Sequence, residues 1–196
     1  MLEIIKKIIE NVLSALYETF GFALMIAVLF MFLYMFAKEK GWKIVVQCWW
    51  EMLKKSVTFR RVFFFVLYTA MILFRTLLNR SVLVDPLTNI IGVWGMYDLE
   101  GQMTTQAIEN LILFIPFTVL LFCGFQEKLI GKTARFWSIL WKSILIVFLC
   151  SLSIEFLQMF LRLGTFQLSD LFYNTLGGLV GGLIYWILFK IGLRKK

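Results

Sequence analysis

Apolar runs of membrane-spanning length recur along the whole chain. A hydrocarbon core of about 30 Å needs roughly 20 apolar residues in a helix, and runs of about this length lie at residues 20–37, 62–79, 108–123, 139–161 and 171–190. With 61% hydrophobic and 16% charged residues, the chain is more apolar than a soluble domain of 196 residues. The runs are continuous rather than alternating, which favours helices over a barrel. We predict an all-α, polytopic membrane helical bundle with about five transmembrane helices.

Two further segments have the pattern of helices that lie along a membrane surface. Residues 1–18 place apolar side chains on one helical face and Lys6 and Lys7 on the opposite face. Residues 42–56 combine tryptophans with lysines, as in a helix at the level of the lipid headgroups. No repeat or linker marks a second domain, so we expect a single membrane domain over residues 1–196.

Basic residues are concentrated in alternate connections between the predicted spans. Residues 38–61 hold seven lysines and arginines, and more lie in the third loop and the C-terminal tail, whereas the other connections carry few. Short cytoplasmic loops retain basic residues, so we predict a multi-pass protein of the cell membrane with its N-terminus outside and its C-terminus in the cytoplasm. The net charge of +8 is then mostly an anchoring charge, and we expect no nucleic-acid partner.

The chain has no histidine, which excludes imidazole bases, imidazole metal ligands and Ser-His nucleophiles. The three cysteines suggest neither a disulfide nor a thiolate metal cluster, and we expect no metal and no cofactor.

Four glycines in the last predicted span form overlapping pairs of small residues four positions apart. This pattern is typical of close helix packing in membranes, although glycines can also line a phosphate site. We favour helix packing for Gly177, Gly178, Gly181 and Gly182.

Polar side chains interrupt the apolar runs near their predicted outer ends. An ionisable group inside a transmembrane helix costs about 3 kcal/mol or more, so its presence indicates a partner, a cavity or a task. At 3.6 residues per turn, Ser151, Glu155, Gln158 and Arg162 share one face of the fourth predicted span, and Asp170 and Asn174 share one face of the fifth. The predicted functional residues are Arg75, Asn110, Glu155, Gln158, Arg162, Asp170 and Asn174.

Two interpretations of these residues stay open. They can hold the helices together, with Arg75 paired with Glu155 and the amides bridging neighbouring spans. They can also line an outward-facing pocket for a polar headgroup or a peptide-like ligand, because arginine binds carboxylate or phosphate through its planar fork. Both can hold at once.

The same residues resemble a known family. Two segments carry the resemblance: ENLILFIPF at 109–117 and SIEFLQMFLRLGTFQLSDLFYNTLGGLVGG at 153–182. Together they resemble the VanZ family of small bacterial membrane proteins. The family-like positions are Asn110, Phe114, Pro116, Glu155, Gln158, Arg162, Asp170, Asn174, Gly177, Gly178 and Gly181. Arg75 resembles an arginine of an earlier family helix, and the family-like core covers about residues 60–190. The chain departs from the family at Gly92, where a proline is common.

The resemblance implies low-level resistance to teicoplanin-type lipoglycopeptide antibiotics, with less drug accumulating at the outer surface of the bacterial cell membrane. The expected partners are membrane lipids and either the antibiotic or a lipid-linked cell-wall precursor. An alternative is an enzyme that modifies an envelope lipid or polyprenyl phosphate, with Glu155 or Asp170 as general base and Arg75 and Arg162 holding phosphate. A lipid transporter is a further alternative, and the oligomeric state is left open.

Overall fold

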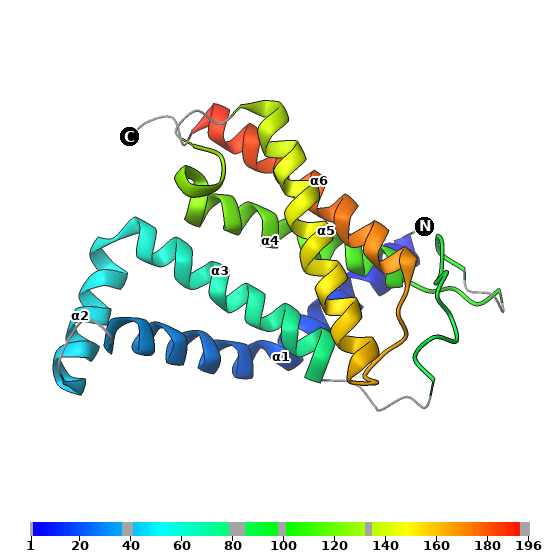
Figure 1. The fold of residues 1–196 in the computed structure, drawn as a ribbon, viewed down its shortest axis with the longest axis horizontal. Coiled ribbons are helices and arrows are strands. Elements are labelled where there is room, and N and C mark those ends of the chain that lie inside the picture. The colour runs from blue at the N-terminus through cyan, green and yellow to red at the C-terminus, as the bar shows by residue number, and fades with distance from the viewer. Residues whose placement is uncertain (1, 37–40, 79–84, 98–100, 132–134, 193–196) are drawn as a thin grey trace.

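The protein is an all-helical bundle, as the sequence predicts (Figure 1). The computed structural model describes residues 2–36, 41–78, 85–97, 101–131 and 135–192. Its elements are α1 (Leu2–Phe36), α2 (Trp42–Lys55), α3 (Val57–Leu73), the π-helical turn η1 (Phe74–Leu78), α4 (Gln106–Leu129), α5 (Phe136–Phe160) and α6 (Leu168–Ile191). Within these ranges, four helical segments are long and apolar enough to cross a membrane: α3 continued into η1, α4, α5 and α6. The chain is therefore a multi-pass membrane protein.

The N-terminal helix differs from the prediction. The sequence predicts a surface helix over residues 1–18 and a separate span from residue 20, but α1 runs without a break from Leu2 to Phe36. The boundary contains no proline, and alanine, leucine and glutamate around it favour helix, so a single Gly21 does not end the helix. The apolar stretch found within α1, Ala23–Phe32, is shorter than the four candidate spans. The surface position of residues 1–18 and the crossing of the first span therefore stay predictions.

α1 and α3 pack side by side through one stripe of α1. Ala23, Ala27, Met31 and Met35 recur at every fourth position of α1 and are buried in a core that it shares with α2 and α3. α2 lies across the ends of these two helices, and its Val45 completes the same core (Figure 1). A helix thus forms over most of the predicted segment 42–56, and the basic side chains at its two ends are exposed.

The glycines of α6 face two different neighbours. A Cβ atom added at Gly181 would lie 2.6 Å from the carbonyl oxygen of Ile115 in α4, and one added at Gly177 would overlap the carbonyl oxygen of Leu111. The two glycines that follow these in the sequence, at 178 and 182, face Val147 and the side chain of residue 143 in α5. α6 therefore lies against the backbone of α4 on one side and against α5 on the other.

The alternating direction of the helices brings five helix termini to one end of the bundle. This end holds η1 and the beginnings of α4 and α6 together with the last turn of α5, and the N-terminus of α1 lies at the same end (Figure 1). α2 and the C-terminal part of α6 lie at the opposite end, where Arg60, Lys128, Arg135 and Lys190 are found. By the distribution of basic residues, the end with η1 is the predicted outer end.

We expect Gly177→Ala to lower the thermal stability of the detergent-solubilised protein. The added methyl group would overlap a backbone carbonyl, which cannot rotate away, and overpacking of this kind costs about 1–3 kcal/mol. Gly192→Ala is the matched control, since no atom of the described residues lies within 4 Å of a Cβ there. Equal melting temperatures for the two variants would contradict a close contact between α4 and α6.

We expect a cysteine at Asp85 to react with a membrane-impermeant maleimide in intact cells and a cysteine at Arg135 to react only after permeabilisation. Both side chains are exposed, and they lie at the predicted outer and cytoplasmic ends. The wild-type chain measures labelling of the native cysteines. The reverse pattern would show that the predicted orientation is wrong.

Candidate functional site at one end of the bundle

Hydrogen bonds and a salt bridge, each made by at least one polar side chain, join four elements at the predicted outer end. We call this set the polar ring, because its contacts run from η1 to α4, from α4 to α6 and its preceding loop, from that loop to α5, and from α5 back to η1. Its members are Arg75, Thr76, Gln106, Glu109, Glu155, Gln158, Gln167 and Asp170.

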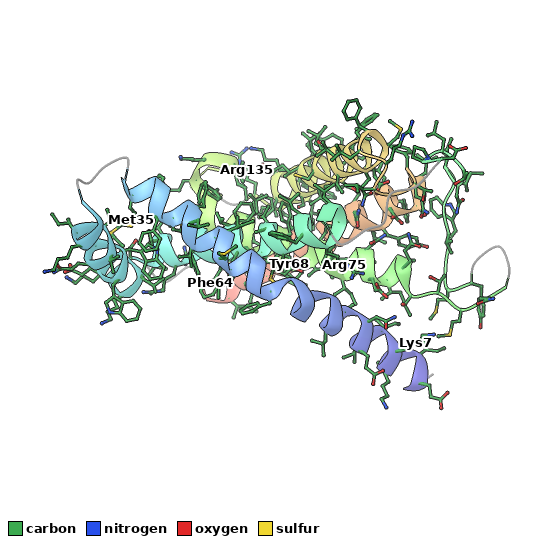
Figure 2. The ribbon with its side chains drawn as sticks, turned by 90° about the horizontal axis from the view of Figure 1, so that it is seen from below. Lys7, Met35, Phe64, Tyr68, Arg75 and Arg135 are labelled. Carbon is green, nitrogen blue, oxygen red and sulfur yellow. The ribbon has the colours of Figure 1, made fainter. Side chains whose placement is uncertain are left out.

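The first contact is a salt bridge between η1 and α4. Nη2 of Arg75 lies 2.6 Å from Oε2 of Glu109, and the two side chains are 30% and 13% exposed. The other carboxylate oxygen accepts hydrogen bonds from the Thr105 hydroxyl and, at 3.3 Å, from Nδ2 of Asn11 in α1. Figure 2 shows Arg75 beside α1 and α4. The contact therefore joins three helical elements.

The guanidinium group of Arg75 binds Glu109, whereas the sequence analysis offered Glu155 as its partner under one of two open interpretations. Glu155 is 2% exposed, and its carboxylate accepts a 2.9 Å hydrogen bond from the backbone N–H of Gln167, in the loop between α5 and α6. The first turn of α4 lies beside η1, so Glu109 in that turn provides the carboxylate that pairs with Arg75.

The second contact joins α4 to α6. Nε2 of Gln106 lies 3.0 Å and 3.2 Å from the two carboxylate oxygens of Asp170 and 2.9 Å from Oε1 of Gln167. Asp170 is only 8% exposed and lies in the first turn of α6, where a negative charge is favoured by the helix dipole. A neutral amide thus holds the buried end of α6 against α4.

The last contact joins α5 to η1. Nε2 of Gln158, which is 2% exposed, donates a 2.7 Å hydrogen bond to the backbone carbonyl of Thr76. Carbonyl groups in the last turn of a helix have no partner within that helix, and π-helical turns are frequent at functional sites. η1 therefore offers both a side chain and a backbone acceptor to the polar ring.

Two predicted site residues lie deeper or beside the ring. Asn174 is 6% exposed and donates a 2.8 Å hydrogen bond to Oγ of Ser151, one turn further into the bundle. Asn110 follows Glu109 in α4, and its Nδ2 atom is buried without a hydrogen-bond partner among the described residues. A buried unpaired donor costs about 1–3 kcal/mol, so this amide is a candidate contact for a ligand.

Arg162 departs from the predicted shared face. Ser151, Glu155 and Gln158 are buried on one face of α5, but the helix ends at Phe160, before Arg162. Arg162 takes a left-handed conformation, with φ 57°, in the turn that follows, and its side chain is exposed. Helical periodicity cannot be extended past the end of a helix, so Arg162 is not brought into the polar ring.

Several residues of this site escaped the sequence analysis. Gln106 lies one turn before Asn110 in α4, so helical spacing could have placed it on the same face. Gln167 comes three residues before Asp170, at the N-cap position of α6. The roles of Asn11 and of the Thr76 carbonyl have no sequence signal, because α1 was expected to lie on the membrane surface and a carbonyl is present at every residue.

We expect Arg75→Met and Glu109→Gln each to lower stability by about 1–3 kcal/mol and the double variant to lose less than the sum. Each single change leaves a partly buried charge without its partner, and directly contacting residues couple by about 0.5–3 kcal/mol. Thermal unfolding in detergent gives the stabilities of the wild-type protein, the two single variants and the double variant, and hence the coupling between the two residues.

The matched control is the pair of Lys55 and Glu51 in α2, at 3.2 Å with side chains 78% and 51% exposed. An exposed pair four residues apart is worth about 0.3–0.5 kcal/mol, although Lys55 lowers the pKa of the Glu51 carboxyl. Equal coupling in the two cycles would contradict a structural role for the Arg75 contact.

Comparison with known proteins places this chain in a family. No solved structure matches the chain. Protein VanZ of Enterococcus faecium is 33% identical over 116 residues, which cover 55% of this chain and 66% of that protein, so the chain spans slightly less than two thirds of this relative. The profile of the VanZ/LLP1 family matches residues 2–189. Because that match covers nearly the whole chain, the protein belongs to the VanZ/LLP1 family.

Proposed function

We propose that this chain lowers the susceptibility of a bacterial cell to teicoplanin-type lipoglycopeptide antibiotics by means of the polar ring at the outer end of the bundle. Family membership and the similarity to Protein VanZ support the class of function. The observation that carries the proposal is that residues of four elements converge at one end of an otherwise apolar bundle. Polar and ionisable side chains are energetically costly inside membrane helices, so their presence there indicates a function.

The polar ring, together with Asn110 beside it, offers groups that suit a polar headgroup attached to a lipid tail. The guanidinium group of Arg75 is partly exposed, and Nδ2 of Asn110 is a buried donor without a partner among the described residues. Both can donate hydrogen bonds to amide, carboxylate or phosphate oxygens. The acyl chain of the antibiotic or of a lipid-linked cell-wall precursor would stay among the membrane lipids. Engagement of either headgroup would hinder productive docking of the drug.

The enzymatic alternative needs two arginines around a phosphate. Arg75 is bound to Glu109, and Arg162 is exposed in the turn after α5, outside the polar ring. Glu155 and Asp170 are buried carboxylates that could act as general base, but Asp170 is bound by Gln106 and Glu155 accepts a backbone hydrogen bond. The geometry therefore favours binding over phosphate chemistry. Turnover of labelled envelope lipids by the purified protein would reverse this preference.

We expect Asn110→Leu to abolish most of the resistance while leaving the protein folded. The change removes a donor that has no partner among the described residues, so little folding energy is lost. The measurement is the minimal inhibitory concentration of teicoplanin in a susceptible host at equal membrane expression.

Ser153→Ala is the control, because Ser153 is exposed on α5 and its hydroxyl bonds only its own helix in the described contacts. Wild-type resistance in Asn110→Leu, or equal loss in both variants, would argue against a binding role for Asn110 and the adjoining polar ring. Loss in Asn110→Leu with full melting temperature would support that role.

A further inference from the structure

The loop before α4 has an unusual surface for a connection outside the membrane. Residues 86–97 contain no charged side chain. Large apolar side chains of this loop are strongly exposed: Leu87 51%, Ile90 43%, Ile91 69%, Trp94 50% and Tyr97 63%. A loop in water gains nothing from such a surface, and contiguous exposed apolar side chains indicate contact with a membrane or a protein.

Hydrogen bonds fasten the loop to the start of α6. The backbone N–H of Leu168 donates to the carbonyl of Ile90 at 2.8 Å, and that of Ser169 donates to the carbonyl of Ile91 at 3.3 Å. The first N–H groups of a helix have no partner within the helix. The loop therefore supplies acceptors to the N-terminus of α6 and is held in a fixed position beside it.

Gly92 allows this close approach. Its φ is +75°, and an added Cβ would lie 2.9 Å from Cβ of Ser169 and would overlap the Ser169 hydroxyl. A proline, with φ fixed near −65°, could not take this conformation. The conformation of Gly92 is thus part of how this chain docks its loop.

The loop also satisfies polar groups within the protein. The indole N–H of Trp94 donates to the carbonyl of Ile91 at 3.0 Å, so this group is turned to the backbone while the ring is half exposed. The N–H of Gly92 donates to Oδ1 of Asn89, and the N–H of Gly95 donates to the hydroxyl of Tyr173. Irregular backbone in contact with lipid needs such internal partners, because lipid supplies none.

The apolar surface of the loop continues the surface of a membrane-spanning helix. The Trp94 ring packs against Phe172 of α6, with centroids 5.3 Å apart, and Phe172 is itself 49% exposed. Leu168, in the first turn of the same helix, is 45% exposed. α6 is one of the segments apolar enough to span a membrane, so its exposed apolar side chains face lipid.

We propose that residues 86–97 insert into the leaflet at this end of the bundle, at the boundary between headgroups and acyl chains. The ring of Trp94 and the side chains of Ile90 and Ile91 contact lipid, as aromatic and aliphatic residues do at membrane interfaces. The partner of this surface is the bilayer in which α6 lies. This contact with lipid is expected whichever side of the membrane this end faces, and whatever the polar ring does.

The test places a nitroxide label on single cysteines in proteoliposomes, with the native cysteines replaced by alanine. At Ile91→Cys we expect collisions with oxygen to exceed those with a water-soluble nickel chelate several-fold relative to Asp85→Cys, the control at an exposed charged residue just outside the segment. Phe160→Cys, 84% exposed at the end of α5, gives the reference for a lipid-facing site. A label at Ile91 that is as accessible to nickel as at Asp85 would overturn the proposal. An immobilised label shielded from both reagents would also overturn it, because it would indicate a second copy of the chain on this surface.

A second measurement keeps the native cysteines and thus needs no altered background. We expect lipids brominated near the headgroup to quench more fluorescence in the wild-type protein than in Trp94→Phe, and lipids brominated deep in the acyl chain to show a smaller difference. Phenylalanine keeps an apolar ring at this position. An identical quenched fraction in the two proteins would place Trp94 outside the bilayer and overturn the proposal.

Discussion

The close approach of α6 to α4 and α5 is the contact on which the other features of the bundle depend. In a bilayer, apolar side chains gain little by leaving lipid for protein, so close helix packing must come from small residues and hydrogen bonds. Gly177 and Gly181 let α6 lie on the carbonyl groups of α4, and the other two glycines do the same for side chains of α5. This contact fixes the relative height of the three helices.

The polar ring depends on these relative positions of α4, α5 and α6 along their axes. Gln106 reaches Asp170 only because the first turns of α4 and α6 lie side by side, and Gln167 reaches Glu155 because the connection from α5 is short. η1, which continues α3, joins the polar ring through Arg75 and the carbonyl of Thr76. The ring thus connects the lobe built on α1 and α3 with the lobe built on α4, α5 and α6.

The helical class and most spans could be predicted because runs of apolar residues report membrane crossing directly. The burial of Glu155, Gln158, Asp170 and Asn174 also agrees with helical spacing. The ion pair of Arg75 could not be predicted, since several carboxylates lie near the same predicted end, and residue spacing does not choose among them. The prediction that Arg162 shares a face of α5 was wrong, because the helix ends in a left-handed turn at this residue. The local sequence does not predict that turn.

The unbroken α1 has a consequence for how the protein fits its bilayer. At about 1.5 Å per residue, a helix of 35 residues extends roughly 52 Å, well beyond a hydrocarbon thickness of about 30 Å. A helix of this length that crosses a membrane must tilt strongly or project from the bilayer by several turns. Asn11, in the N-terminal part of α1, donates a hydrogen bond to Glu109. A change in bilayer thickness that alters the tilt of α1 would therefore pull on the carboxylate that holds Arg75.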